Sequence, residues 1–139
     1  MDTVKDNRHL YIGGSDIPII LGISPFKTRQ QLLLEKLGVE ENNFTGNIYT
    51  EYGNVMEPKI RAHINKEFGS YFIEDSFIAE ESNKNLGIRV NVDGYNPITG
   101  EVLEIKTSSN PEKHLKQYKS QLLFYMQCFK AKRGLLALY

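Results

Sequence analysis

The sequence predicts a mixed α/β domain in which helices flank a central mixed β-sheet. Two long segments repeat their apolar residues every three to four positions, as amphipathic helices do. Extended segments rich in β-branched and aromatic residues lie between these two segments and at the end of the chain. The expected order is therefore helix, three strands, helix and strand (α-β-β-β-α-β), after a short helical lead-in.

Length and composition limit the class of protein. A chain of 139 residues is typical of one domain, so we expect residues 1–139 to form a single unit. Because Cys128 is the only cysteine, the sequence excludes an intrachain disulfide, a cysteine-based zinc site and a four-cysteine iron–sulfur cluster. We find no secretory signal and no membrane span, and we expect a cytoplasmic protein without a membrane partner.

The net charge of zero hides a division along the chain. The segment from Lys106 to Arg133 has seven basic residues and one acid, a charge of +6, and the rest has 10 basic and 16 acidic residues, a charge of −6. Such a division is compatible with a basic face for a polyanion beside an acidic cluster for a cation, and equally with solvated helix faces.

The first half of the chain predicts three helical elements. Ser15 is the expected cap of a short N-terminal turn in which Pro18 occupies an early position. A helix is expected from Thr28 to Leu37, ended by Gly38. After a loop from Glu40 to Asn47, a longer helix is expected.

The longer helix should run from Thr50 to Phe68 and end at Gly69. Its apolar positions Ile60, Ile64 and Phe68 recur every four residues, which predicts one buried stripe.

The second half predicts the sheet and the last helix. The turn-forming segment Asn96–Gly100 should join two strands into a hairpin. The expected strands are Tyr71–Ala79, Gly87–Tyr95, Glu101–Thr107 and Leu135–Tyr139. A helix should run from Pro111 to Lys130, broken by Gly134, with a buried face of Leu115, Tyr118, Leu122, Tyr125, Met126 and Phe129.

Two acids and a lysine on the hairpin are the candidate chemical centre. Glu104 and Lys106 share one face of their strand, whereas Ile105 points to the opposite layer. Pairing of the two strands would bring Asp93 near Glu104. Two close acids suit Mg²⁺ or Mn²⁺, and such an ion activates water for phosphoryl chemistry. The alternative is a strand-end turn at Asp93 and a surface pair of Glu104 and Lys106.

Two more polar residues lie on or beside apolar helix faces. Glu57 falls on the stripe of its helix, where a carboxylate needs a partner, unless it lies at the rim of the stripe. Gln121 borders the core stripe of the last helix, where it is either functional or an ordinary boundary amide.

Five ordered elements resemble one known family. They are Arg8-x-x-x-Ile12-Gly13-Gly14-Ser15-Asp16, Gly53-x-x-x-Glu57-Pro58, Asp93-Gly94, Glu104-x-Lys106 and Tyr118-x-x-Gln121. The chain from Arg8 to Tyr139 thereby resembles the YqaJ-type viral recombinases, the lambda-exonuclease-like branch of the PD-(D/E)XK nuclease superfamily. Its core order is the one predicted above. Members usually continue beyond the last strand, so we expect a minimal member, a C-terminally truncated one or a degenerate phage remnant.

The resemblance implies metal-dependent hydrolysis of DNA phosphodiesters with Mg²⁺, or Mn²⁺ in its place. Asp93, Glu104 and the Ile105 carbonyl would bind the metal. Lys106 would be the catalytic lysine, and Gln121 would orient it or the attacking water. Glu57 would bind metal-bound water or a second ion.

The same resemblance implies that Arg8 and Ser15 lie near the terminal phosphate of the substrate strand. From the residues alone, Arg8 would be interpreted as a solvated arginine and Ser15 as an ordinary helix N-cap. Lys113, Lys116 and Lys119 are candidate phosphate contacts. The three histidines are too scattered for a metal site, and His114 is expected to be exposed, with contact to DNA as the alternative.

We therefore expect a 5′→3′ exonuclease acting on duplex DNA ends in phage-type recombination, with a single-strand annealing protein and further copies of the chain as candidate partners. The alternatives are an endonuclease of the same superfamily and a non-catalytic module that binds DNA ends or a partner.

Overall fold

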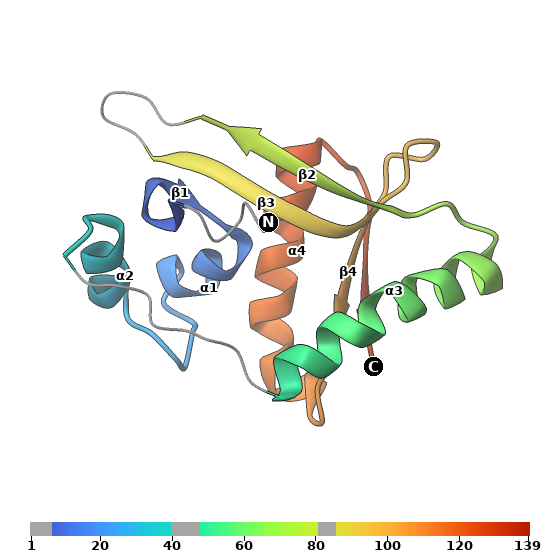
Figure 1. Cartoon of the computed structure of the whole chain (residues 1–139), viewed down its shortest axis with the longest axis horizontal. Helices are drawn as coiled ribbons and strands as arrows, with labels where there is room; N and C mark the ends of the chain where they lie inside the picture. Colours follow the sequence, from blue (N-terminus) through green and yellow to red (C-terminus); the bar gives the residue numbers. More distant parts are fainter. Residues whose placement is uncertain (1–6, 40–47, 81–85) are drawn as a thin grey trace.

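The computed structural model describes residues 7–39, 48–80 and 86–139, and it confirms a mixed sheet flanked by helices (Figure 1). The predicted loop from Glu40 to Asn47 lies outside the described residues. The helices are α1 (Ile17–Ile20), α2 (Arg29–Lys36), α3 (Ile48–Phe68) and α4 (Leu115–Phe129), with 3-10 turns η1 (Arg8–Leu10), η2 (Gly14–Asp16) and η3 (Pro111–His114). The strands are β1 (Tyr11–Ile12), β2 (Ile73–Ala79), β3 (Gly87–Tyr95), β4 (Val102–Lys106) and β5 (Gly134–Leu138).

Strand β3 is the centre of the sheet. It pairs antiparallel with β2 along one edge, and its other edge receives β1 in parallel at its start and β4 antiparallel at its end. β5 pairs in parallel with β4. The predicted β3–β4 hairpin is confirmed, and in its turn Asn96 Oδ1 accepts hydrogen bonds from the backbone N–H groups of Ile98 and Thr99. β1 was not predicted, because two residues are too few for alternation to show.

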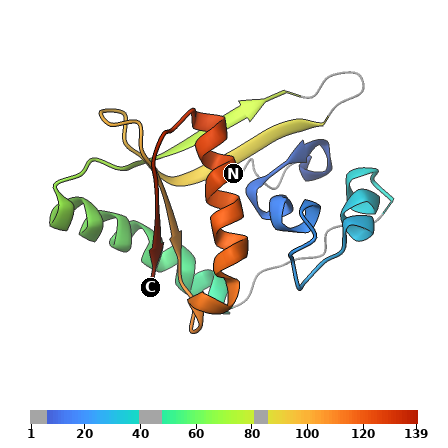
Figure 2. The same cartoon turned by 180° about the vertical axis from the view of Figure 1, so that it is seen from behind.

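The two long helices cover opposite faces of the sheet. α3 lies on the face of the sheet that is turned toward the viewer in Figure 1. α4 crosses the opposite face, which is turned toward the viewer in Figure 2. The core under α3 contains Ile60, Ile64, Phe72, Leu103 and Ile105. The core under α4 contains Val90, Val92, Val102, Leu122 and Tyr125. The periodicity of the sequence predicted both helices, and it placed Ile60, Ile64, Leu122 and Tyr125 correctly on their buried faces.

Several end signals behave as predicted. Thr28 caps α2 in a reciprocal pair with Gln31, since each side chain accepts a hydrogen bond from the other residue's backbone N–H. Gly38 and Gly69 follow α2 and α3 with positive φ angles of 76° and 59°. Pro18 occupies the first turn of α1.

Four local predictions are wrong. Ser15 caps nothing, because Gly13 precedes η2 and its N–H donates to the Asp16 carboxylate. Phe68 is 76% exposed, since the final turn of α3 extends beyond the strands that bury Ile60 and Ile64. α4 ends at Phe129 with Lys130 in the left-handed conformation, so the helix is finished before Gly134 begins β5. Tyr118 is not in the core but faces a cleft.

Candidate active site

A β-bulge in β3 forms the base of the site. Between the β2–β3 pairs Ile73–Tyr95 and Asp75–Val92, β3 advances by three residues while β2 advances by two. The extra residue falls at Asp93-Gly94 and changes the direction of the strand there. Asp93 therefore lies inside a continuous strand, and the alternative of a strand-end turn is wrong.

Glycine is required beside Asp93 because two strands meet closely at this point. A Cβ on Gly94 would lie 2.8 Å from the Cβ of Phe72 and 3.0 Å from that of Leu103. The interior glycine was the sequence signal for the bulge, and the sequence analysis did not use it.

The backbone of β4 turns toward Asp93 just beyond the hairpin pairing. The Ile105 N–H donates to Asp93 Oδ2 at 2.7 Å, and the carbonyl of the next residue, Lys106, accepts from Tyr139 on the β5 side. Since neighbouring peptide units of a strand face opposite edges, the Ile105 carbonyl faces the Asp93 edge.

Asp93 and Glu104 form a coupled pair of acids. Burial, and then the interaction with the Glu104 carboxyl group, raise the pKa of Asp93 from 3.8 to about 8. Glu104 is only 5% exposed, and its Oε2 atom is buried with no hydrogen-bond partner among the residues that the structure describes. The pKa of Tyr125 is raised by burial and by the charges of Glu104 and Asp93. An unsatisfied buried carboxylate oxygen at a pair of acids is the electrostatic setting that a cation relieves.

Lys106 is held between α4 and the acids. Its Nζ donates to Gln121 Oε1 at 2.9 Å, lies 3.9 Å from Glu104 Oε1 and is 5.4 Å from the centre of the Tyr118 ring. The predicted opposition of Lys106 and Ile105 across the sheet is confirmed, because Ile105 packs in the core under α3. Gln121 is therefore a direct partner of the lysine.

Glu57 of α3 lines the cleft and is paired with Arg61. The Arg61 Nη1 donates to Glu57 Oε1 at 2.7 Å and to the Asp93 carbonyl at 3.0 Å, and Nη2 donates to Glu74 Oε1 at 3.1 Å. Burial and the nearby Asp93 charge raise the pKa of Glu57, and Arg61 opposes that rise. Sequence analysis missed Arg61, although its position four residues after Glu57 on a helix is a signal for such a pair.

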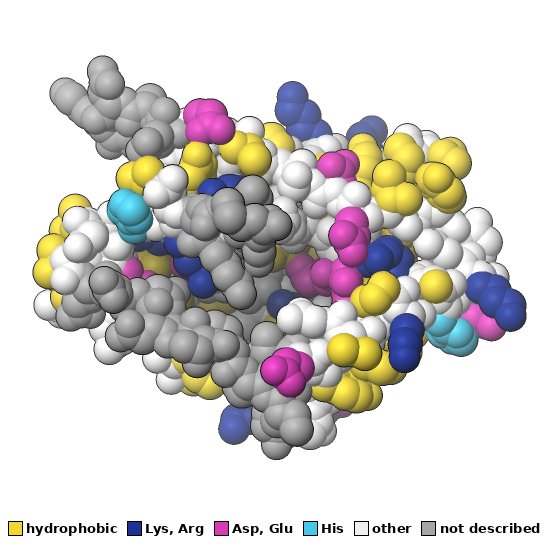
Figure 3. Space-filling model, viewed as in Figure 1, with side chains coloured by type: hydrophobic (Ala, Val, Ile, Leu, Met, Phe, Trp, Pro, Cys, Tyr) yellow, Lys and Arg dark blue, Asp and Glu magenta, His cyan; other side chains and the backbone are white. Residues whose placement is uncertain are grey.

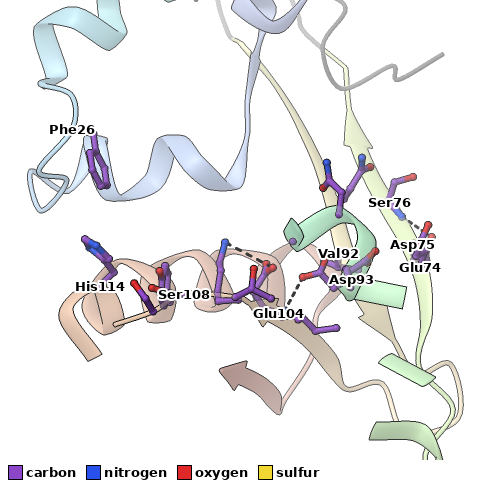
Figure 4. Close-up of a pocket in the computed structure, with 18 residues that line it drawn as sticks. Phe26, Glu74, Asp75, Ser76, Val92, Asp93, Glu104, Ser108 and His114 are labelled. Atoms are coloured by element: carbon purple, nitrogen blue, oxygen red, sulfur yellow. Dashed lines mark hydrogen bonds and ion pairs between the residues drawn. The ribbon is translucent and has the colours of Figure 1, made fainter. Parts of the chain in front are cut away.

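One large cleft of about 1170 Å³ is lined by Glu57, Asp93, Glu104, Ile105 and Lys106. Figure 4 shows Asp93 and Glu104 together beneath α3, with Phe26 and His114 at the other end of the view. In the space-filling view, acidic side chains gather next to basic ones near the middle of the α3 face (Figure 3). Of the basic segment from Lys106 to Arg133, Lys106 lines this cleft, with its Nζ 3.9 Å from Glu104 Oε1.

A smaller cavity of about 230 Å³ adjoins the cleft, and Asn91 and Lys106 line both. Arg8 and Ser15 line this smaller cavity together with Gln121. The N-terminal segment reaches this place because Gly14 lies directly against the Tyr125 ring, which leaves no room for a Cβ. It is also fastened by Lys36, whose Nζ donates to the Arg8 and Tyr11 carbonyls and contacts Asp16.

The three candidate phosphate lysines do not lie in either cavity. Lys113, Lys116 and Lys119 are exposed on η3 and α4. His114, between the first two, was expected to be exposed but is partly buried and lines the cleft.

Asp93, Glu104 and the Ile105 carbonyl offer hard oxygen ligands of the kind that Mg²⁺ and Mn²⁺ prefer. In the described part of the chain, no three Asp, Glu, His or Cys side chains converge closely enough to hold a metal by themselves. The residues therefore fit an ion bound by two carboxylates, one backbone oxygen and water. Glu57 is separated from this pair by its contact with Arg61.

Comparison with known proteins identifies relatives of the chain and of its fold. The model of the YqaJ-like viral recombinase domain family matches residues 5–131. No curated protein matches the sequence. No helix in the described ranges is long and apolar enough to cross a membrane.

Several solved structures share the fold. An alkaline exonuclease from Laribacter hongkongensis, LHK-Exo, has a TM-score of 0.69 at 20% identity over 95% of this chain and 70% of that chain. Its complex with dAMP has a TM-score of 0.71 at 20% identity over 96% and 71%. A phage-related exonuclease from Haemophilus somnus 129PT has a TM-score of 0.66 at 21% identity over 96% and 71%.

Proposed function

This chain belongs to the YqaJ-like viral recombinase domain family, and on that premise we propose that it is a metal-dependent deoxyribonuclease, a 5′→3′ exonuclease acting on duplex DNA ends. The observation that carries the proposal is the meeting of Asp93, Glu104 and the Ile105 backbone at the bulge, with Lys106 beside them. Such a nuclease would act in the cytoplasm of a bacterial or phage-infected cell.

In this proposal Asp93, Glu104 and the Ile105 carbonyl hold a Mg²⁺ or Mn²⁺ ion. When bound, the ion lowers the pKa of water and neutralises charge on the phosphate. Binding requires the Asp93 carboxyl group to lose the proton that its raised pKa favours. Glu57 would bind water on the ion, or a second ion.

Lys106 orients the attacking water, helps to deprotonate it or stabilises the developing negative charge. The Gln121 amide holds the ammonium group at 2.9 Å, so it is a positioning residue in this proposal. Attack forms a new bond from the water oxygen to phosphorus, and the bond from phosphorus to the leaving sugar oxygen breaks.

Arg8 and Ser15 bind the terminal phosphate of the substrate strand in the smaller cavity. A guanidinium and a hydroxyl group both donate well to a phosphate. Because Lys106 and Gln121 line the same cavity, an end bound there lies beside the acidic pair. This adjacency favours an end-dependent exonuclease over an endonuclease.

The first experiment compares linear and closed-circular duplex DNA, incubated with the purified protein and with Mg²⁺, Mn²⁺ or EDTA. We expect metal-dependent degradation of the linear DNA alone. Cutting of the circle would instead identify an endonuclease. A folded protein that cuts neither DNA with either metal would be a binding module.

A further inference from the structure

An exposed phenylalanine stands at the mouth of the cleft. Phe26 follows α1 and is 81% exposed, yet it lines the same cleft as Asp93 and Glu104. Single exposed apolar residues are common on protein surfaces and need no explanation alone. Phe26 differs from Phe68, which is 76% exposed at the end of α3 and lines neither cavity.

The loop that carries Phe26 is fastened to the rest of the fold. The Ile23 and Ser24 N–H groups both donate to the Pro18 carbonyl, and the Ser24 hydroxyl accepts from the Phe26 N–H at 3.1 Å. Gln117 of α4 donates to the Ile23 carbonyl at 3.2 Å. These bonds hold the ring at a defined place over the start of α4.

Phe26 is the first member of a row of rings that ends at Lys106. Its ring centre is 5.7 Å from that of His114, and the His114 centre is 6.1 Å from that of Tyr118. The Lys106 Nζ lies 5.4 Å from the Tyr118 ring centre. Figure 4 shows the Phe26 and His114 rings facing each other from two separate elements. One wall of the cleft is therefore aromatic from its mouth to the lysine.

We propose that Phe26, supported by His114, is a stacking site for a nucleobase of the DNA strand that enters the cleft. The proposal rests on the proposed function, because it needs a nucleic acid substrate. Every base has an aromatic face, so one exposed ring can hold successive bases of any sequence. A single ring is small for a protein interface, whereas it matches one base in size. Lys113 and Lys116 flank His114 in sequence and provide exposed positive charge for the adjoining phosphates.

The test measures binding of short 5′-phosphorylated oligonucleotides by fluorescence anisotropy, in EDTA to prevent cleavage. One abasic residue is moved through the oligonucleotide one position at a time. For the wild-type protein we expect one or two positions at which the abasic residue weakens binding about fivefold to a hundredfold.

The variants are Phe26→Ala, Phe26→Trp and the matched control Phe68→Ala. Phe26→Ala should weaken binding of the intact oligonucleotide by the factor that the abasic residue causes in the wild-type protein. The abasic residue should have no further effect on this variant, since the two changes remove the same contact. Phe26→Trp and Phe68→Ala should behave as wild type. Because Phe26 is exposed, thermal melting should show an unchanged fold.

If Phe26→Ala binds DNA as the wild type does and still degrades linear DNA, the stacking site is overturned, whereas the proposed nuclease function stands. The exposed ring would then be a candidate contact for a partner protein. The stacking site is also overturned if the abasic residue weakens binding to Phe26→Ala as much as it weakens binding to the wild-type protein, because the two changes would then remove different contacts. A wild-type protein that neither binds nor cuts DNA overturns the proposed function as well.

Discussion

The acidic part of the cleft and the smaller cavity beside it are built in different ways. The acidic part, with Asp93 and Glu104, is formed by paired strands and is largely buried. The smaller cavity, with Arg8 and Ser15, is formed in part by short 3-10 turns, and Ser15 is exposed. Lys106 lines both the cleft and the smaller cavity. In the proposed function the sheet supplies the reaction and the N-terminal turns select the DNA end.

The largest loss of cleavage activity is expected when either acid of the cleft, Asp93 or Glu104, is replaced. Asp93→Asn and Glu104→Gln should each reduce cleavage of linear DNA at least about a thousandfold, because the metal contributes several kcal/mol of stabilisation to the transition state. Neither change creates a buried charge, so circular dichroism should show an intact fold. Near-normal cleavage by either variant, or cleavage in excess EDTA, would contradict the metal mechanism.

The second largest loss of activity is expected at Lys106, which lines both the cleft and the smaller cavity. Lys106→Ala is expected to lower kcat by about a hundredfold to ten-thousandfold, the range of a positioned acid or base. Gln121→Ala should lower kcat about tenfold to a hundredfold and alter its pH profile, because the lysine loses its 2.9 Å partner.

Gln127→Ala is the matched control for Gln121, since Gln127 is an exposed glutamine on the same helix. The comparison fails if both glutamine variants lose activity equally. A Gln121→Ala enzyme with a normal pH profile would show that this amide does not act through Lys106.

Changes at the smaller cavity should affect selection of the end rather than the reaction. Arg8→Ala is expected to lower the preference for 5′-phosphorylated over 5′-hydroxyl ends about tenfold to a hundredfold, the worth of a hydrogen bond to a charged group. Cleavage rates on both substrates measure this preference. Arg133→Ala is the control, because Arg133 is exposed and pairs with Glu101 outside both cavities. A retained preference in Arg8→Ala would refute the end-binding role.

The smallest effect concerns stability without metal. Because the pKa of Asp93 is raised from 3.8 to about 8, the folded state keeps a proton that the unfolded chain releases. The free energy of unfolding in EDTA should therefore fall as pH rises from about 4 to about 8, lowering Tm by several degrees. Mg²⁺ should restore stability at the upper end of this range. Asp93→Asn should reduce the pH dependence of the free energy of unfolding. If the variant keeps the wild-type pH dependence, groups other than Asp93 cause it.

The sequence by itself determined the order of the main elements. Ile60 and Ile64 define the buried stripe of α3, Thr28 and Gly38 mark the ends of α2, and the Asn96 turn joins β3 to β4, because each signal acts over a few neighbouring residues. It also placed Glu104 and Lys106 on one face of a strand, since alternation is a local property of extended chains.

Only the tertiary structure decided how these residues meet. The bulge at Asp93 depends on pairing with β2, the pair of Arg61 with the Asp93 carbonyl joins α3 to β3, and the place of Arg8 depends on Gly14 against Tyr125. Tyr118, which was expected in the core, lines the wall of a cleft for the same reason. Contacts between residues distant in sequence depend on how whole elements pack, and local patterns carry no information about that packing.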